Sequence, residues 1–346
     1  MKIGIVTFEI SNIGGIATHA SHTYKCLKKA GIETDLILIK SSNVKYSEEK
    51  VNEGATSSSL TTGGIVMSVH DKHLESTCAK LDQYDILFYT HACIHDEKAN
   101  WLDIYKLKNP KHIVTISDVY WDKFYPYFDE AIPHIHKFLA TNSAAQEYLS
   151  TIKYIESELL IHPFILDDIG CEYEKENIAV WANQWRGWKG INDWVDQIPK
   201  YNGIARMFGT GREYYNLRDK MQTIPNIEYL GNRPPSEILN AYKTAKFNVD
   251  LTGRSPGYFG HYNRTTVEGI FYGAVTVCYN TLVSPYSHIP RNLCLVVDRN
   301  NIAKKMNELQ SDPDKFKEIS IKASTWACKY YDYKKSVEQI VGKGIL

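Results

Sequence analysis

Residues 248–278 read NVDLTGRSPGYFGHYNRTTVEGIFYGAVTVC, and this stretch decides the fold. It predicts a buried strand over Phe247–Leu251, a Gly/Pro-rich loop over Thr252–Asn263, a helix over Arg264–Tyr272 and a buried strand over Ala274–Cys278. Strands that alternate with helices in this way are typical of a parallel sheet. The glycine-containing loop can approach a ligand closely, and the N–H groups of the following helix N-terminus favour an anion.

One carboxylate interrupts the predicted helix, which is otherwise apolar. Glu268 lies four residues after Arg264. A buried carboxylate needs a partner, which is either a pair of hydroxyl groups on a bound ligand or an internal ion pair with Arg264. The stretch by itself leaves both interpretations open.

The composition places the chain among ordinary globular proteins. It has 346 residues, of which 43% are hydrophobic and 23% charged, and this length predicts two domains. Its 40 Lys and Arg balance 40 Asp and Glu, so the whole-chain charge favours neither nucleic acid nor a membrane. The seven cysteines have no CxxC spacing and predict reduced thiols in a cytoplasmic protein. Without a long apolar run, we expect a soluble protein with no stable membrane anchor.

The first half of the chain alternates strands and helices. The strand Lys2–Phe8 leads to the Gly14-Gly15 turn, which is followed by a helix over Ile16–Ala30 and the strand Thr34–Lys40. The turn lacks the GxGxxG spacing of a dinucleotide-binding fingerprint. A Gly-Gly turn that opens a helix can still hold an anion.

Polar residues follow two further strands of this half. His91 follows the strand Asp85–Thr90, and Asp118 follows the strand His112–Ile116. Ligands of open parallel sheets bind at the carboxyl ends of the strands, so both side chains are candidates for chemistry. A hydrogen-bonded core histidine and a helix-capping aspartate are the alternatives.

Three segments of the first half have unusual compositions. The aromatic segment Tyr120–Tyr127 contains Tyr120 and Trp121, and predicts either a surface that stacks on a sugar or base or a packing cluster. The Ser/Thr/Gly-rich segment Glu48–Gly64 predicts a loop or mobile flap. The acidic segment Leu166–Glu176 suits an interdomain linker that acts as a hinge.

A second alternation begins with the strand Asn177–Ala182. The loop after it, NQWRGWKG, places Arg186 and Lys189 at the strand's carboxyl end. Arg offers a planar fork and Lys a point charge, a pair well suited to a diphosphate. The alternative is two solvated loop cations. Helices over Asn301–Leu309 and Pro313–Tyr330 are predicted to close this half.

The order of these landmarks resembles the GT-B nucleotide-sugar glycosyltransferases, specifically their large retaining family four. The landmarks are Gly14-Gly15, Ser117-Asp118, WRGWKG, the GTG turn at 209–211 and VEGIFYGA at 267–274. The resemblance covers nearly the whole chain and implies an α/β fold of two Rossmann-like parallel-sheet domains facing across a cleft. The expected domains are an acceptor-side domain over 1–166, a nucleotide-sugar-binding domain over 167–330 and a C-terminal helix within 331–346 that packs back on the first domain.

The resemblance also implies roles for single residues. Arg186 and Lys189 would hold the donor diphosphate, although strict family spacing places the cation at Gln184, and Glu268 would bind the ribose hydroxyls. Asp118 would orient or deprotonate the acceptor. The expected donor-binding residues are Gly14, Gly15, Arg186, Lys189, Gly260, His261, Tyr262, Asn263, Arg264, Thr265 and Glu268, and the expected acceptor-binding residues are His91, Tyr120 and Trp121.

Two positions depart from the family pattern. Gly260 stands where the family has a glutamate that contacts the donor sugar, and Ser117 stands where it often has a histidine. Sugar recognition would then rest on loop N–H groups within Tyr258–Asn263 or on another group such as Asp250. Gly260 also keeps open a catalytically silent nucleotide-sugar-binding protein on the same fold.

A narrower resemblance is to the T-even phage α-glucosyltransferases, which modify hydroxymethylcytosine in DNA. It rests on the WKG loop, the aspartate after the same strand and a diverged E-x7-E motif. It implies a retaining transferase with Asp118, Arg186 and Lys189 as catalytic residues. The expected donor is a nucleotide sugar such as a UDP-sugar, without a cofactor or an essential metal. The expected acceptor is a hydroxymethylated pyrimidine in duplex DNA, in the host cytoplasm. The alternative acceptor is a surface polysaccharide or a glycolipid.

Overall fold

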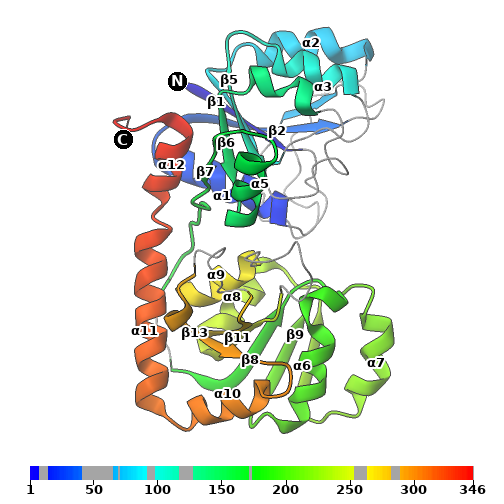
Figure 1. Ribbon diagram of the computed structural model, residues 1–346, viewed down its shortest axis with the longest axis vertical. Coiled ribbons are helices and arrows are strands. Elements are labelled where there is room, and N and C mark those ends of the chain that lie inside the picture. The colour runs from blue at the N-terminus through cyan, green and yellow to red at the C-terminus, as the bar shows by residue number, and fades with distance from the viewer. Residues whose placement is uncertain are drawn as a thin grey trace. The chain divides into compact units, whose positions relative to one another are not determined.

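The computed structural model describes residues 1–7, 15–40, 65–68, 71–91, 98–116, 128–170, 174–252, 263–281 and 289–345. The chain divides into two compact units (Figure 1). The N-terminal unit comprises residues 1–165 together with 331–346, and the C-terminal unit comprises residues 166–330. The predicted flap Glu48–Gly64 lies outside the described residues.

The N-terminal unit is built on a seven-stranded sheet in the order β3-β2-β1-β4-β5-β6-β7, with every neighbouring pair parallel. The strands are β1 (Lys2–Thr7), β2 (Glu33–Lys40), β3 (Ile65–Ser68), β4 (Ile86–Tyr89), β5 (Lys111–Ile116), β6 (Lys137–Ala140) and β7 (Glu158–Leu159). The helices are α1 (Gly15–Lys29), α2 (Asp71–Leu81), α3 (Lys98–Tyr105), α5 (Ser143–Thr151) and α12 (Tyr333–Val341), with single 3₁₀ turns η1 (Phe128–Glu130) and η2 (Ile132–His134).

Successive side chains along the strands of this unit point to opposite faces of the sheet, so there is one hydrophobic layer on each face. Ile3 and Ile5 of β1 pack in the layer of α1 and α12, whereas Val6 packs in the layer of α2, α3 and α5. The C-terminal helix α12 also supports the sheet edge. Its Gln339 side chain accepts from the Ile161 N–H at 2.8 Å and donates to the Leu159 carbonyl at 2.8 Å. These bonds satisfy backbone groups that an edge strand leaves unpaired.

One buried histidine makes the stability of the N-terminal unit depend on pH. His112 of β5 is fully buried, and its Nδ1 lies 2.9 Å from the Tyr89 hydroxyl. Burial, and secondarily the charges of His136 and His134, lower the pKa of His112 to about 4, although the hydrogen bond to the Leu107 carbonyl opposes this shift. His112 is therefore neutral in the folded unit at neutral pH.

We expect acid to destabilise this unit through His112. Between its unfolded pKa near 6.5 and its folded pKa of about 4, the unfolded chain binds the proton more readily. The free energy of unfolding therefore falls as pH drops through this window, by about 3 kcal/mol at pH 4. Hydrogen exchange of β4 and β5 amides at pH 7 and pH 4.5 measures how much unfolding free energy is lost on acidification. This loss should be smaller in His112→Gln and unchanged in the control His73→Gln. An equal loss in both variants would contradict this assignment.

The C-terminal unit is built on a six-stranded parallel sheet in the order β10-β9-β8-β11-β12-β13. The strands are β8 (Glu176–Ala182), β9 (Ile204–Phe208), β10 (Ile227–Gly231), β11 (Ala245–Asp250), β12 (Val275–Tyr279) and β13 (Cys294–Val297). The helices are α6 (Ile191–Gln197), α7 (Tyr214–Gln222), α8 (Pro235–Thr244), α9 (Arg264–Phe271), α10 (Ile302–Gln310) and α11 (Pro313–Tyr330), with 3₁₀ turns η3 (Gly187–Lys189), η4 (Ile198–Lys200) and η5 (Arg291–Leu293).

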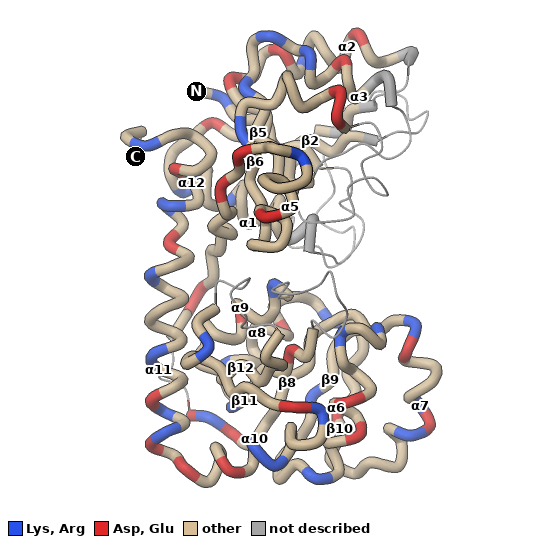
Figure 2. Tube along the Cα trace, in the orientation of Figure 1, with Lys and Arg blue, Asp and Glu red and all other residues tan. Residues whose placement is uncertain are grey.

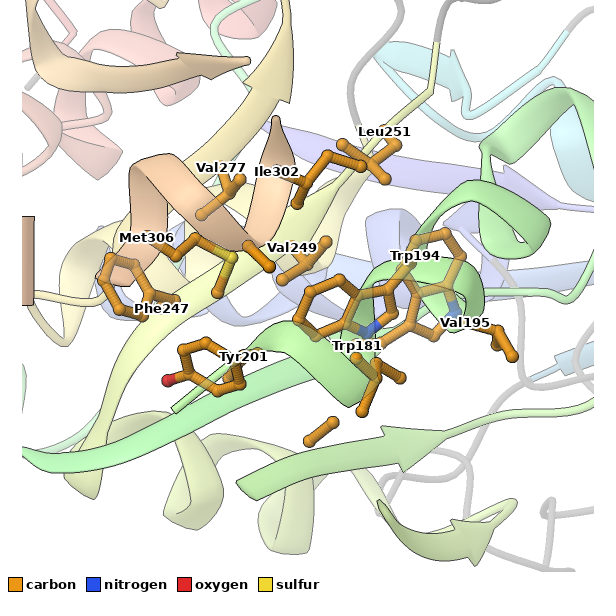
Figure 3. Packing of buried hydrophobic residues seen from close by; sticks show 14 of the residues in the cluster. Trp181, Trp194, Val195, Tyr201, Phe247, Val249, Leu251, Val277, Ile302 and Met306 are labelled. Carbon is orange, nitrogen blue, oxygen red and sulfur yellow. The ribbon is translucent and has the colours of Figure 1, made fainter. Parts of the chain in front are cut away.

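Helices cover both faces of this sheet. On one face, Trp181 of β8 and Val249 of β11 pack with Trp194 of α6 and Met306 of α10 (Figure 3). On the other face, Ile178, Val180 and Ala182 of β8 pack with Tyr242 of α8. A strand that is apolar on both faces needs such double cover. The prediction of two Rossmann-like units with parallel sheets is confirmed.

Both sheets have the same winding, and it fixes where a ligand can bind. The strand order reverses between β1 and β4 in the N-terminal unit and between β8 and β11 in the C-terminal unit. Open α/β sheets bind ligands at this switch point, beside the carboxyl ends of the two strands. The loop that follows β8 and the residues that end β11 are therefore the first place to look in the C-terminal unit.

Strand β7 contains only two residues, because the chain next contains His162-Pro163 and the Ile161 N–H is bonded to α12 instead of to a strand. Strand β13 was not predicted at all. It pairs in parallel with β12 and contains only four residues, CLVV, too few to show a period.

The two units divide at the first residue of the predicted linker Leu166–Glu176. Its described residues are hydrogen-bonded to the C-terminal unit, and its role as a hinge stays a prediction. The Lys175 ammonium donates to the carbonyls of Tyr242, Lys243 and Tyr272, and the Tyr272 hydroxyl donates to the Asp167 carbonyl at 2.7 Å. The cation stabilises the carbonyl ends of α8 and α9, where the helix dipoles are negative.

Charged residues of both signs are interspersed along the surface helices. Figure 2 shows this along α7 and α11, in agreement with the balanced composition. No helix among the described residues is both long enough and apolar enough to span a membrane.

Candidate functional site

The loop after β8 is held in one shape by glycines and buried aromatics. Gly190 has a φ of +78°, and a Cβ added there would lie 2.5 Å from the Leu251 Cβ and 2.9 Å from the Leu251 carbonyl oxygen. Only glycine accepts both the left-handed backbone and this close approach. The loop is thereby held against the end of β11, and Lys189, the last residue of η3, lies at the switch point.

The GTG turn after β9 supports the same loop from the other side. Gly209 and Gly211 lie so close to the loop that a Cβ on either would meet the backbone oxygen of Asn183 or Trp185, at 2.3 and 2.5 Å. The Trp185 N–H donates to the Thr210 carbonyl at 3.0 Å, and its buried indole N–H donates to the Phe208 carbonyl at 3.1 Å. The glycines of this turn therefore serve loop packing.

Asp250, the last residue of β11, is fully buried and accepts hydrogen bonds on both carboxylate oxygens. Its donors are the Thr252 N–H at 3.1 Å, the Thr252 hydroxyl at 2.5 Å, the Asn263 N–H at 3.1 Å, the Asn263 amide at 2.8 Å and the Thr266 hydroxyl. A buried carboxylate needs this degree of satisfaction. The suggestion that Asp250 recognises the donor sugar is therefore wrong, since its oxygens are occupied from within.

Lys189 is buried beside this network. Its ammonium donates to the Asn263 side-chain oxygen and lies 5.1 Å from the centre of the Trp188 ring. Burial lowers the pKa of Lys189 to about 8, with Arg186 also lowering it and Asp250 opposing the shift. The cost of burying this cation would be relieved by an anion bound beside it.

Arg186 differs from Lys189 in its exposure. It is exposed on the same loop, as is Gln184, the position at which strict family spacing would place the cation. Among the described residues, no carboxylate forms an ion pair with Arg186. Its guanidinium can therefore turn towards a ligand without breaking an internal pair.

Helix α9 directs its N-terminus at the same switch point. Asn263 is its N-cap residue, yet its side chain makes no capping hydrogen bond because it is engaged by Asp250 and Lys189. Asn at this position usually caps the first-turn N–H groups. An uncapped N-terminus beside a buried ammonium is suited to an anion.

Glu268 and Arg264 form the internal pair that the sequence analysis kept as an alternative. The Arg264 Nε lies 3.8 Å from a Glu268 carboxylate oxygen, and Glu268 is buried. Burial raises the pKa of Glu268, and Arg264 opposes this shift. The distance is long for a charge-assisted hydrogen bond, so the pair leaves the carboxylate able to accept from a ligand hydroxyl. Thr265 is half-buried on the first turn of the same helix.

The remaining predicted residues divide into two groups. His91 is buried two residues after the end of β4, at the switch point of the N-terminal sheet, which agrees with either interpretation of it. Gly15 is the first residue of α1. The other predicted site residues lie outside the described residues: Gly14, Asp118, Tyr120, Trp121, Gly260, His261 and Tyr262. In the part of the chain that the structure describes, no group of His, Cys, Asp and Glu side chains could hold a metal ion.

Comparison with solved structures agrees with this architecture. An alpha-glucosyltransferase in complex with UDP-glucose and DNA containing an abasic site superposes with a TM-score of 0.73 at 15% identity, over 98% of this chain and 99% of that chain. The chain has the GT-B fold. Anabaena HepE in complex with UDP-glucose superposes with a TM-score of 0.69 at 13% identity, over 98% of both chains. No protein-family model and no curated protein sequence matches the chain.

Proposed function

We propose that the chain is a retaining glycosyltransferase that moves a sugar from a nucleotide sugar, such as a UDP-sugar, to an acceptor hydroxyl. The observation that carries the proposal is the buried Lys189 ammonium at the uncapped N-terminus of α9. A cation and a helix dipole converge there, as a diphosphate leaving group requires. The GT-B structures that the chain resembles contain UDP or UDP-glucose, which supports the choice of donor.

In this proposal the C-terminal unit binds the donor. Lys189 and Arg186 stabilise the negative charge that develops on the diphosphate as its bond to the anomeric carbon breaks. Glu268 accepts hydrogen bonds from the ribose hydroxyls. The acceptor oxygen attacks the anomeric carbon from the face that the diphosphate leaves, which retains the anomeric configuration. Asp118 orients or deprotonates that acceptor, and no metal takes part.

The preferred acceptor is the hydroxymethyl group of a modified pyrimidine in duplex DNA. This choice is supported by structural similarity to an alpha-glucosyltransferase whose structure was solved with UDP and a DNA 13-mer containing an HMU base. A base within a duplex must be extruded before its hydroxyl can react. The N-terminal unit, with His91, Tyr120 and Trp121, would then contact the extruded base.

Incubation of the purified chain with a panel of nucleotide sugars tests the proposal. Each donor is supplied with EDTA, with and without duplex DNA that contains hydroxymethylcytosine, and the digested nucleosides are weighed by mass spectrometry. We expect a hexose- or pentose-sized gain on the modified base and an α-linked product by NMR. Donor turnover without a DNA product would move the acceptor to a polysaccharide or glycolipid. Neither turnover nor nucleotide binding would indicate a catalytically silent protein.

A further inference from the structure

Asp250 has an unusual environment for a fully buried carboxylate. Among the described residues, no Lys or Arg forms an ion pair with it, and its two oxygens are satisfied by hydroxyl, amide and backbone donors. The nearest cation in this hydrogen-bond network is Lys189, which donates to Asn263, and Asn263 in turn donates to Asp250. The carboxylate and the ammonium are therefore linked through a single side-chain amide.

The orientation of that amide follows from its two charged neighbours. The Asn263 Nδ2 donates to Asp250 Oδ1 at 2.8 Å and to the Thr252 hydroxyl at 2.7 Å, and the Asn263 Oδ1 accepts from the Lys189 ammonium. An ionised carboxylate only accepts hydrogen bonds and an ammonium only donates them. The reverse orientation would place the NH₂ group against the ammonium and the carbonyl against the carboxylate. Asp250 thus selects the face that Asn263 presents to Lys189.

We infer that Asp250 is a positioning residue for the diphosphate site, because it orients the Asn263 amide, which in turn holds the Lys189 ammonium at the N-terminus of α9. This inference rests on the proposed function, since it assigns Lys189 to a diphosphate. Asp250 does not touch the donor. Because Asp250 reaches Lys189 only through Asn263, it forms no direct ion pair with the ammonium. The positive charge of Lys189 therefore remains available to an anion.

The charges around Lys189 give this role a signature that a purely structural role lacks. Asp250 of β11 favours the charged form of Lys189, Arg186 of the same loop disfavours it, and α9 adds the opposed charges of Arg264 and Glu268. Removing the charge of Asp250 should therefore make Lys189 lose its proton at lower pH. An anion binds to the protonated form of Lys189. Without the charge of Asp250, nucleotide affinity should therefore be lost at a lower pH.

Calorimetric titration of UDP from pH 6.5 to pH 9.5 tests the inference. We expect Asp250→Asn to weaken binding by about tenfold at pH 7 and to lower the pH at which half the affinity is lost. The matched control is Asp193→Asn. It removes another buried carboxylate, on α6, which accepts from Tyr279 and pairs with Arg299, and it should leave that midpoint unchanged.

The variant Asn263→Ala keeps the inference falsifiable even if Asp250→Asn is unstable, because unchanged UDP binding in Asn263→Ala would also overturn the positioning role. Asn263→Ala breaks the relay at its centre and should also weaken UDP binding by about tenfold. If Asp250 acts through Asn263, the change Asp250→Asn should add no further loss in the Asn263→Ala background. Full additivity of the two losses, or an unshifted pH midpoint in Asp250→Asn, would overturn the positioning role. If the unaltered chain binds no nucleoside diphosphate at any pH, the proposed function itself fails.

Discussion

Replacement of Lys189 by methionine is expected to lower the rate of sugar transfer by about 10²–10³. Methionine keeps most of the apolar length of the side chain but loses the ammonium, which lies over the Trp188 ring and supplies the charge beside α9. Electrostatic stabilisation of a leaving diphosphate is made mostly in the transition state, so kcat should fall more than the donor KM rises. Steady-state kinetics with the active donor measures both constants.

The matched control for this prediction is Lys246→Met. Lys246 is a lysine of β11 whose ammonium donates to the Asn177 side chain at 2.7 Å, away from the switch point. Its replacement should leave kcat and KM within about twofold, because exposed polar contacts contribute little. Unchanged turnover in Lys189→Met would remove Lys189 from the site, and an equal loss in both variants would point to a stability effect instead.

Replacement of Gly190 by alanine is expected to damage both stability and transfer. The left-handed backbone at φ +78° costs a non-glycine residue about 1–2 kcal/mol. The added Cβ also meets the Leu251 backbone oxygen at 2.9 Å, so the loop must move away from β11. That movement draws Lys189 away from Asn263, and a displacement of about 1 Å at a reacting group can lower the rate by about 10²-fold.

The chain supplies a control that separates the two causes. Gly31 has a φ of +76° with nothing within 4 Å of an added Cβ, so Gly31→Ala carries the backbone strain without the collision. We expect Gly31→Ala to lower the melting temperature moderately and leave transfer intact, and Gly190→Ala to lower both. Normal transfer in Gly190→Ala would show that the loop does not need its contact with Leu251 to place Lys189.

The sequence was sufficient to predict the helices and strands in which apolar residues recur with a clear period. The strand around Val249 and the helix that contains Glu268 were predicted to within about two residues, because each combines an apolar pattern with a clear turn signal. Strand β13 is too short to show a period, and its existence depends on pairing with β12. Lys189 could be singled out because a cation between glycines at the end of a strand is a local pattern.

The role of Asp250 could not be found in the same way. Its donors Asn263 and Thr266 lie across a loop whose path the sequence does not specify, and an aspartate that ends a strand has several other uses. The one local clue is the spacing Asp250-x-Thr252, which suits a side-chain turn but does not point to Lys189. Contacts between distant segments decide this part of the site.

The most direct test is whether a nucleoside diphosphate binds next to Lys189 and whether the Lys189 amine takes up a proton from the buffer when it does. UDP and other nucleoside diphosphates are titrated at pH 8.5 in two buffers of different ionisation enthalpy, so that calorimetry counts the protons taken up. Because the pKa of Lys189 is about 8 in the free chain, we expect binding to take up a substantial fraction of one proton, and Lys189→Met to abolish that uptake. Binding without proton uptake, or with the same uptake in Lys189→Met, would contradict the assignment of the diphosphate to this site.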